Sequence, residues 1–454
     1  MTGPPGPLTS LPCHRYNAAK GAGTGSSALM DNIPYQKTTL PNGLRVLTAQ
    51  MPHTHSVAIS IYVGTGSRYE TPEQAGLAHF LEHLCFKGTK RYPSPQEISQ
   101  AIDGVGGAIN AATDRELTVF YCKVAQPHFA LALDVLTDLI RQPLLASDEF
   151  EKERKVVIEE LAMVADSPNQ QVDLLLDETL WPDQPLGRDV AGSEASVMGL
   201  TRDMAVQYLH QQYVPNNIVV SAAGAVTHKQ VMKHVSASLG DWERGVPQGW
   251  FPAVNGQARP RAASKYKATE QAHLSLAVRG LPIQHPDRFI LSLLSVVLGE
   301  GMSSRLTLEL REKRGLCYDV HSYISSFQDA GSLTIYAGVD PADAEEALSA
   351  ILVEMARLRD ELVGEDEFDR AKELMKGRLL LRMEDTRVVS DWLGGQELLT
   401  GHVRTVDEVT EEIDAVTRED TQRIARQLFV AEQLNLAVVG PYRSPRRFQK
   451  LLRF

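Results

Sequence analysis

A stretch rich in glycine and proline divides the chain near its middle. Residues 240–263 read GDWERGVPQGWFPAVNGQARPRAA and show neither helical nor strand periodicity, which is typical of a linker. The chain has 454 residues, whereas single hydrophobic cores stop growing at roughly 250–300 residues. The sequence therefore predicts two or more domains, with a boundary at this stretch.

The two sides of the boundary show a similar order of elements. After the stretch, QAHLSLAVRGL (271–281) is a predicted strand and HPDRFILSLLSVVLGEG (285–301) a predicted helix, as strands and helices also alternate before it. The economical interpretation is two α+β domains that arose by a diverged duplication. The predicted parts are a disordered tail at 1–33, a first domain at 34–243, a linker at 244–263 and a second domain at 264–454.

Charge and hydropathy exclude several kinds of partner. The formal net charge is −11 and there is no long basic run that could follow a phosphate backbone, so nucleic acid is not expected. No apolar segment approaches the roughly 20 residues that span a bilayer, so a membrane is not expected either. The four cysteines lack CxxC spacing, which favours a reducing compartment. We expect the cytoplasm, although the acid-poor first residues also fit an organellar matrix.

The segment GLAHFLEHLCFKGT, residues 76–89, carries two histidines and a glutamate on a predicted helix. Its apolar residues recur at i, i+3, i+4 and i+7 and form one stripe: Leu77, Phe80, Leu81 and Leu84. His79, Glu82 and His83 lie on the other side, and histidines four apart face the same way, as two ligands of one tetrahedral Zn²⁺ require. The alternative is a polar side that merely faces solvent, but the order His-x-x-Glu-His is the inverted zincin motif.

A second predicted helix, residues 147–166, offers the third ligand that a catalytic zinc needs. Ser147 is its predicted N-cap. Glu153 and Glu160 fall on the apolar stripe of this helix, where a carboxylate is costly unless a cation compensates it. Zinc would compensate Glu160, and Glu153 would hydrogen-bond a ligand. An internal salt bridge to an arginine explains this helix equally well when it is read alone; beside the histidines, the metal is favoured.

These motifs resemble those of the pitrilysin/insulinase family of zinc peptidases, in the branch of roughly 50 kDa subunits that includes the mitochondrial processing peptidase. In that family the third ligand follows the motif by about 77 residues, and that step leads here from His83 to Glu160. The resemblance, which runs from about residue 34 to the C-terminus, implies one Zn²⁺ per chain bound by His79, His83 and Glu160. It implies Glu82 as the general base and Glu153 as a supporting acid.

The resemblance also implies a fold. It is α+β, with two similar domains that each pack a mostly antiparallel β-sheet with α-helices, as in metallopeptidases of the processing-peptidase/LuxS-like fold. The second half of the chain has no counterpart of the His/Glu cluster. The second domain is therefore expected to bind no zinc and to contribute substrate-binding residues instead.

Two further segments resemble substrate-binding parts of the family. GGAINAATDRELTVFY (106–121) resembles the active-site edge strand, which implies that Asn110 and Ala111 bind an extended substrate; an ordinary sheet strand is a compatible reading. LREKRGLCYDVHS (310–322) resembles a segment that supplies an Arg and a Tyr seven residues apart, here Arg311 and Tyr318. The resemblance assigns this pair to substrate and transition-state binding.

The chain also departs from the mitochondrial enzyme. Gln170 and Gln171 stand near the place of acidic residues that receive a presequence arginine there, which argues against arginine-directed cleavage. The long glycine-rich loop of the non-catalytic partner subunit is represented only by LGEGMSS, residues 298–304, which argues against that identity. Because the zinc motif and the Arg/Tyr pair lie on one chain, the sequence instead predicts a homodimer that needs no other kind of subunit.

The expected function is therefore a zinc-dependent endopeptidase that cleaves unfolded peptides. The net negative charge favours basic peptides as substrates. Two alternatives remain open: a catalytically silent structural core subunit, and a catalytic subunit that needs a different partner chain. Ligand type also restricts the metal only loosely, so Mn²⁺ and Co²⁺ stay possible occupants beside zinc.

Overall fold

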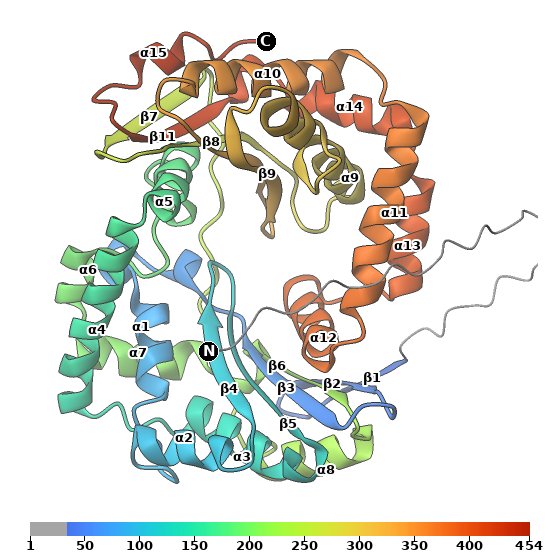
Figure 1. Ribbon diagram of the computed structural model, residues 1–454. Helices are drawn as coiled ribbons and strands as arrows, with labels where there is room; N and C mark the ends of the chain where they lie inside the picture. Colours follow the sequence, from blue (N-terminus) through green and yellow to red (C-terminus); the bar gives the residue numbers. More distant parts are fainter. Residues whose placement is uncertain (1–33) are drawn as a thin grey trace, which may run out of the picture. The chain divides into compact units, whose positions relative to one another are not determined.

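The computed structural model describes residues 34–454 (Figure 1). The tail predicted at 1–33 lies outside the described residues. Among the helices of the described part, none is long and apolar enough to cross a membrane.

Two β-sheets organise the described chain, one in each half. The first has six strands in the order β1-β2-β6-β3-β5-β4, and the second has five in the order β7-β11-β8-β10-β9. The strands of the first sheet are β1 Tyr35–Thr39, β2 Arg45–Gln50, β3 Ser56–Val63, β4 Ala108–Thr113, β5 Thr118–Ala125 and β6 Ile218–Gly224. Those of the second are β7 Arg261–Tyr266, β8 Ala272–Arg279, β9 Cys317–Ser326, β10 Gly331–Val339 and β11 Asn435–Gly440.

Apart from β1, the two sheets have the same topology. In each, the first and last strands in sequence pair in parallel, β2 with β6 and β7 with β11, and the other pairs are antiparallel. The third strand in sequence, β4 or β9, is the outermost in both. This confirms the predicted α+β fold with two similar halves and mostly antiparallel sheets.

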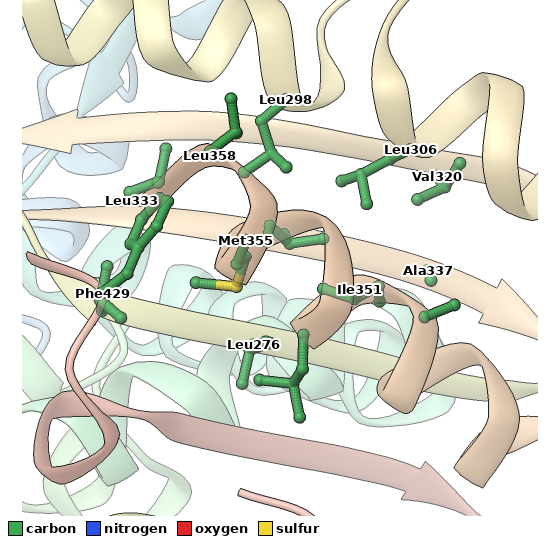
Figure 2. Packing of buried hydrophobic residues seen from close by; sticks show 14 of the residues in the cluster. Leu276, Leu298, Leu306, Val320, Leu333, Ala337, Ile351, Met355, Leu358 and Phe429 are labelled. Atoms are coloured by element: carbon green, nitrogen blue, oxygen red, sulfur yellow. The ribbon is translucent and has the colours of Figure 1, made fainter. Parts of the chain in front are cut away.

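Helices cover both sheets. In the first half they are α1 Leu77–Cys85, α2 Pro95–Asp103, α3 Phe129–Arg141, α4 Ser147–Asp166, α5 Pro168–Leu180, α6 Glu194–Gly199, α7 Arg202–Gln212 and α8 His228–Leu239. In the second half they are α9 Arg288–Gly299, α10 Ala344–Asp360, α11 Glu365–Arg382, α12 Thr386–Thr400, α13 Val406–Ala415, α14 Arg418–Leu428 and α15 Arg446–Gln449. Figure 2 shows α10 packing on the second sheet, where Met355 and Ile351 lie among Leu276, Leu333 and Ala337.

Each sheet is also covered by a helix from the other half of the chain. Helix α5 buries Val172 and Leu176 in one cluster with Ala277 and Val439 of the second sheet. Conversely, α12 joins a cluster with the first sheet (Figure 1). The residues of that cluster include Val389 and Leu393 from α12 and Tyr62 and Val219 from the sheet. The two halves are therefore interlocked by apolar packing as well as joined by the linker.

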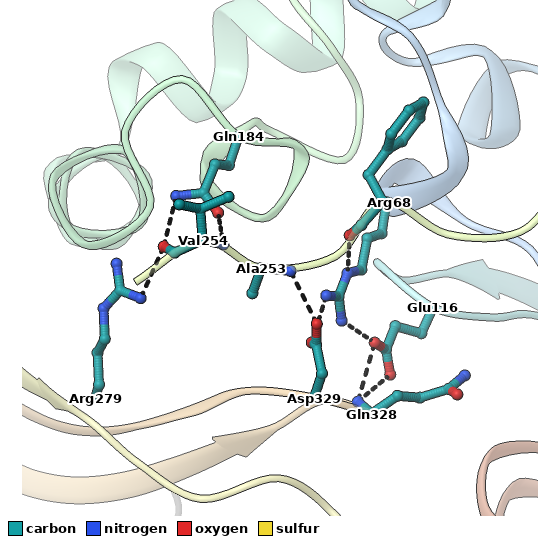
Figure 3. Close-up of polar contacts among 9 residues, drawn as sticks. Arg68, Glu116, Gln184, Ala253, Val254, Arg279, Gln328 and Asp329 are labelled. Carbon is teal, nitrogen blue, oxygen red and sulfur yellow. Dashed lines mark hydrogen bonds and ion pairs between the residues drawn. The ribbon is translucent and has the colours of Figure 1, made fainter. Parts of the chain in front are cut away.

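The segment between the two sheets is fixed by hydrogen bonds to both halves (Figure 3). Arg68 is fully buried and donates to the carboxylates of Glu116 and Asp329 and, from Nε at 3.0 Å, to the Phe251 carbonyl. Asp329 in turn accepts the Ala253 N–H at 2.8 Å. Because these bonds join loops of the first half, the linker and the turn between β9 and β10, the linker has a defined path between the halves.

The linker predicted at 244–263 runs into the first strand of the second sheet, since β7 begins at Arg261. Residues 261–266 have no apolar alternation. The strand exists because it pairs in parallel with β11, from Arg261 beside Asn435 to Tyr266 beside Gly440. Such pairing depends on a segment far away in sequence and leaves no local pattern.

Candidate metal centre

Helix α1 is anchored by its apolar stripe and by a capping carboxylate. The four predicted stripe residues are all fully buried: Leu77, Phe80, Leu81 and Leu84. Gly76, which precedes the helix, has a φ of +93°, and a Cβ there would lie 2.5 Å from the Ala191 carbonyl oxygen, so glycine is required. The Glu70 carboxylate accepts the N–H groups of Gly76 and Ala78 at 2.8 and 2.6 Å. The helix therefore presents its polar side in a fixed orientation.

Helix α4 begins one residue away from the predicted cap. Ala146 is the N-cap and Ser147 makes no capping hydrogen bond, so the prediction for Ser147 is wrong. Leu145, with a φ of +46°, turns the chain before the helix and places Ser147 inside the first turn. The apolar pattern of this helix predicts that its two acids are not fully exposed, and indeed Glu153 is 3% exposed and Glu160 is partly buried.

Three predicted ligands come together between α1 and α4. The Nε2 atoms of His79 and His83 are 3.3 Å apart, and Glu160 Oε2 lies 3.8 Å from the first and 3.5 Å from the second. Zinc held tetrahedrally by bonds of about 2.0–2.1 Å separates its ligand atoms by roughly 3.3–3.4 Å. The donor set of two imidazoles and one carboxylate, at these separations, therefore fits a zinc ion.

The environment of the two imidazoles suits metal binding. Burial, aided by the charge of His83, lowers the pKa of His79 to about 4, so its ring is neutral and able to act as a ligand. Burial acts in the same direction on His83, but the hydrogen bond from its Nδ1 to Glu153 Oε2, at 3.1 Å, and the charges of the nearby carboxylates together outweigh burial and raise the pKa of His83. The same bond fixes the ring of His83 so that Nε2 faces Glu160.

Glu153 has a cationic partner that sequence reasoning missed. Lys87 Nζ lies 2.6 Å from Glu153 Oε1, while the other oxygen contacts His83. The salt bridge predicted as the alternative thus exists for Glu153, with a lysine in place of an arginine. In the described part of the chain, the ion pairs of Glu160 are only with His79 and His83. The only sequence signal for Lys87 is its spacing of four residues from His83, just beyond the end of α1.

Replacing Glu153 by glutamine should weaken zinc binding about 10–100-fold, because the variant loses the charged partner that orients His83. Competition with a chromogenic chelator measures this affinity. Glu159→Gln is the matched control, since Glu159 is exposed on the same helix. Equal zinc affinities for the two variants would contradict the role of Glu153.

Glu82, the predicted base, projects from α1 beside the ligands and has a partner on the first sheet. The Thr113 hydroxyl donates to Glu82 Oε2 at 2.6 Å. Burial raises the pKa of Glu82, and this hydrogen bond opposes the rise. Thr113 was not among the predicted site residues, although it lies in the segment 106–121 that was predicted to be the edge strand.

The predicted edge strand is β4, the outermost strand of the first sheet. Asn110 is exposed and its Oδ1 accepts the N–H of Ala111 at 2.8 Å. Ala111 pairs across the sheet with Phe120 of β5, and its side chain is buried. The position at the edge is thus as predicted, and substrate binding by the two residues stays a prediction.

Arg311 and Tyr318 form a separate group in the second half. The Arg311 guanidinium carbon lies 4.9 Å from the centre of the Tyr318 ring, and that ring is 78% exposed. Arg311 lies on a π-helix, Thr307–Lys313, which precedes Gly315 at a φ of +65°. Tyr318 lies on β9, the outermost strand equivalent to β4. The predicted pair is thus in contact, and Tyr318 lies on the same kind of edge strand as Asn110.

Known families and proteins match most of the chain. The family described as "Insulinase (Peptidase family M16)" matches residues 45–194, and "Peptidase M16 inactive domain" matches 199–375. An uncharacterised zinc protease of Bacillus subtilis is 38% identical over 407 residues, which cover 89% of this chain and 98% of that protein. An uncharacterised zinc protease of Mycobacterium tuberculosis is 38% identical over 426 residues, which cover 92% of this chain and 96% of that protein.

Solved structures share the fold. A protease from Helicobacter pylori superposes with a TM-score of 0.84 at 23% identity and covers 90% of this chain and 100% of its own. A chain of Complex III2 from Candida albicans superposes with a TM-score of 0.79 at 20% identity. The match covers 92% of this chain and 100% of that chain. The zinc-site residues lie in the range matched by the insulinase family, and Arg311 and Tyr318 lie in the range matched by the inactive domain. The chain belongs to the insulinase family, peptidase family M16.

Proposed function

We propose that this chain is a zinc-dependent endopeptidase that hydrolyses peptide bonds in unstructured peptides. The observation that carries the proposal is the approach of His79, His83 and Glu160 to the separations of a tetrahedral zinc site. The zinc-protease names of relatives that are 38% identical support it.

Each residue of the candidate centre has its own role in the proposed hydrolysis. When bound, zinc supplies a Lewis acid that lowers the pKa of water from 15.7 toward ~7 and polarises a carbonyl group. Glu82 takes the proton of the attacking water and returns it to the leaving amine. Tyr318 and Arg311 stabilise the negative charge that develops on the carbonyl oxygen. The Glu153 contact keeps the His83 ring in place throughout.

The edge strand β4 is the proposed substrate cradle. An extended peptide adds to it as a further strand, which favours unfolded over folded substrates. Binding would exchange the present bond between Asn110 Oδ1 and the Ala111 N–H for bonds to the peptide. The net charge of −11 favours basic peptides in general. Gln171 is buried with its amide bonded to the Ala165 carbonyl, so it offers no charge to a substrate arginine.

The chain is proposed to act without a different partner, as a homodimer. Support comes from the presence of all four zinc-site residues and of the Arg311–Tyr318 contact in one chain. The competing proposal is a structural core subunit, since a chain of Complex III2 from Candida albicans has a similar fold. Fold similarity carries no activity with it, and the metal donor set favours the enzyme.

The test uses the full chain expressed alone. We expect one zinc per chain by elemental analysis, a dimer mass by light scattering, and peptide cleavage that a chelator stops. A chain without stoichiometric zinc would contradict the enzyme and support a core subunit. Zinc without cleavage, followed by cleavage when a second chain is supplied, would contradict self-sufficiency.

A further inference from the structure

The contact between Thr113 and Glu82 joins the proposed base to the proposed substrate strand. Thr113 is the last residue of β4, and its hydroxyl lies 2.6 Å from Glu82 Oε2. Within residues 34–454 this is the only side-chain hydrogen bond of that carboxylate, and it engages one of the two oxygens. The bond therefore holds Oε2 of the proposed base in place.

The direction of this hydrogen bond follows from the neighbouring hydroxyl groups. Thr118, opposite Thr113 on β5, donates its one proton to the Thr65 carbonyl at 3.0 Å. Thr118 thus has no proton left for Thr113, whose Oγ1 is 3.4 Å away. An ionised carboxylate only accepts, so the Thr113 proton points to Glu82. Hydrogen bonds to a charged acceptor are roughly twice as strong as neutral ones.

The residues behind Thr118 are buried and paired with one another. Thr65, which receives the Thr118 proton, contacts the Tyr208 hydroxyl of α7 at 2.6 Å, and both residues are buried. Thr113 lies two residues after Ala111 on the same strand. The residue that holds Glu82 therefore belongs to the strand that is proposed to receive the peptide.

We propose that Thr113 is a positioning residue, which orients the Glu82 carboxylate from the end of β4. The inference rests on the proposed function, because it assigns roles to the same strand and base. It adds a positioning residue, at the end of the proposed substrate strand, for the carboxylate that acts on the peptide. In the free protein the bond already preorganises Glu82.

The test compares Thr113→Val, which keeps the branched shape and removes the hydroxyl, with Thr113→Ser, which keeps the hydroxyl. In Thr113→Val we expect kcat to fall about 10–100-fold, as for other outer partners of metal-site residues, with KM changed much less. In Thr113→Ser we expect kcat close to that of the wild type. Zinc content should stay at one per chain in both variants, since Thr113 contacts no ligand.

Thr118→Val is the matched control, because it removes the facing hydroxyl without touching Glu82. Its kcat should remain near that of the wild type. An unchanged kcat in Thr113→Val, an equal loss in Thr113→Ser, or an equal loss in Thr118→Val would each overturn the positioning role. If the wild type itself holds no zinc and cuts no peptide, the proposed function fails and this inference falls with it; the first three results leave the function standing.

Discussion

Glu82→Gln should retain one zinc per chain and lose about 10²–10⁴-fold in kcat/KM for peptide cleavage. The amide has the shape of the carboxylate but cannot take a proton from water. The three ligands are unchanged, and the carbonyl oxygen of the new amide can still accept the Thr113 proton that Glu82 Oε2 now receives. Initial rates on an internally quenched peptide, with elemental analysis of the same sample, measure both quantities.

The control for this substitution is Glu159→Gln, which removes an exposed carboxylate from the ligand-bearing helix α4. It should leave both zinc content and cleavage unchanged. Full activity in the Glu82 variant would contradict the assignment of Glu82 as the general base. Loss of zinc in that variant would show instead that Glu82 acts through the metal site's integrity.

Arg68→Met should lower the free energy of unfolding by about 3–5 kcal/mol, the usual cost of removing one partner from a buried ion pair. Arg68 is 0% exposed and Glu116 is 5% exposed, so the substitution leaves a buried carboxylate without its cation. It also removes the donor to the Phe251 carbonyl in the linker. Urea unfolding followed by tryptophan fluorescence is suitable, because the Trp250 ring lies 4.3 Å from the guanidinium carbon.

The comparison for this stability change is Arg91→Met. Arg91 pairs with Asp134 at 3.0 Å, but its side chain is 59% exposed, and exposed pairs contribute only about 0–1 kcal/mol. Adding Glu116→Gln and Asp329→Asn to the Arg68 variant should recover part of the loss, since the uncompensated charges are then removed. Similar unfolding free energies for the single Arg68 and Arg91 variants would contradict the role of the buried network.

Part of the candidate zinc centre could be predicted because its signals are local. The four buried residues of α1 follow a helical period, which fixes the side on which His79, Glu82 and His83 lie. Glu160 could be found because a carboxylate on an apolar stripe needs a cation, and the structure gives it only the two histidines among the described residues. Read alone, helix α4 fits an internal salt bridge equally well, so the choice of Glu160 also used the histidines of the first helix and the spacing of the resembled family.

The remaining features depend on segments far apart in sequence. Thr113 meets Glu82, 31 residues earlier, only because the first sheet brings β4 beside α1. Helix α5 packs on the second sheet and α12 on the first, because the partners of their apolar faces lie in the opposite half of the chain. Local patterns cannot choose between two similar sheets as the surface that a helix covers. For the same reason the predicted linker, 244–263, includes the first three residues of β7.

The central claim is that this chain alone is a metal-dependent endopeptidase. A mass-spectrometric map of the cuts in a mixed library of unstructured peptides, with and without chelator, tests it most directly. We predict internal cuts that disappear with the chelator, return with added Zn²⁺ and are absent in the Glu82→Gln variant. A library left intact by the zinc-loaded wild type, or cuts that persist in the chelator, would contradict the account.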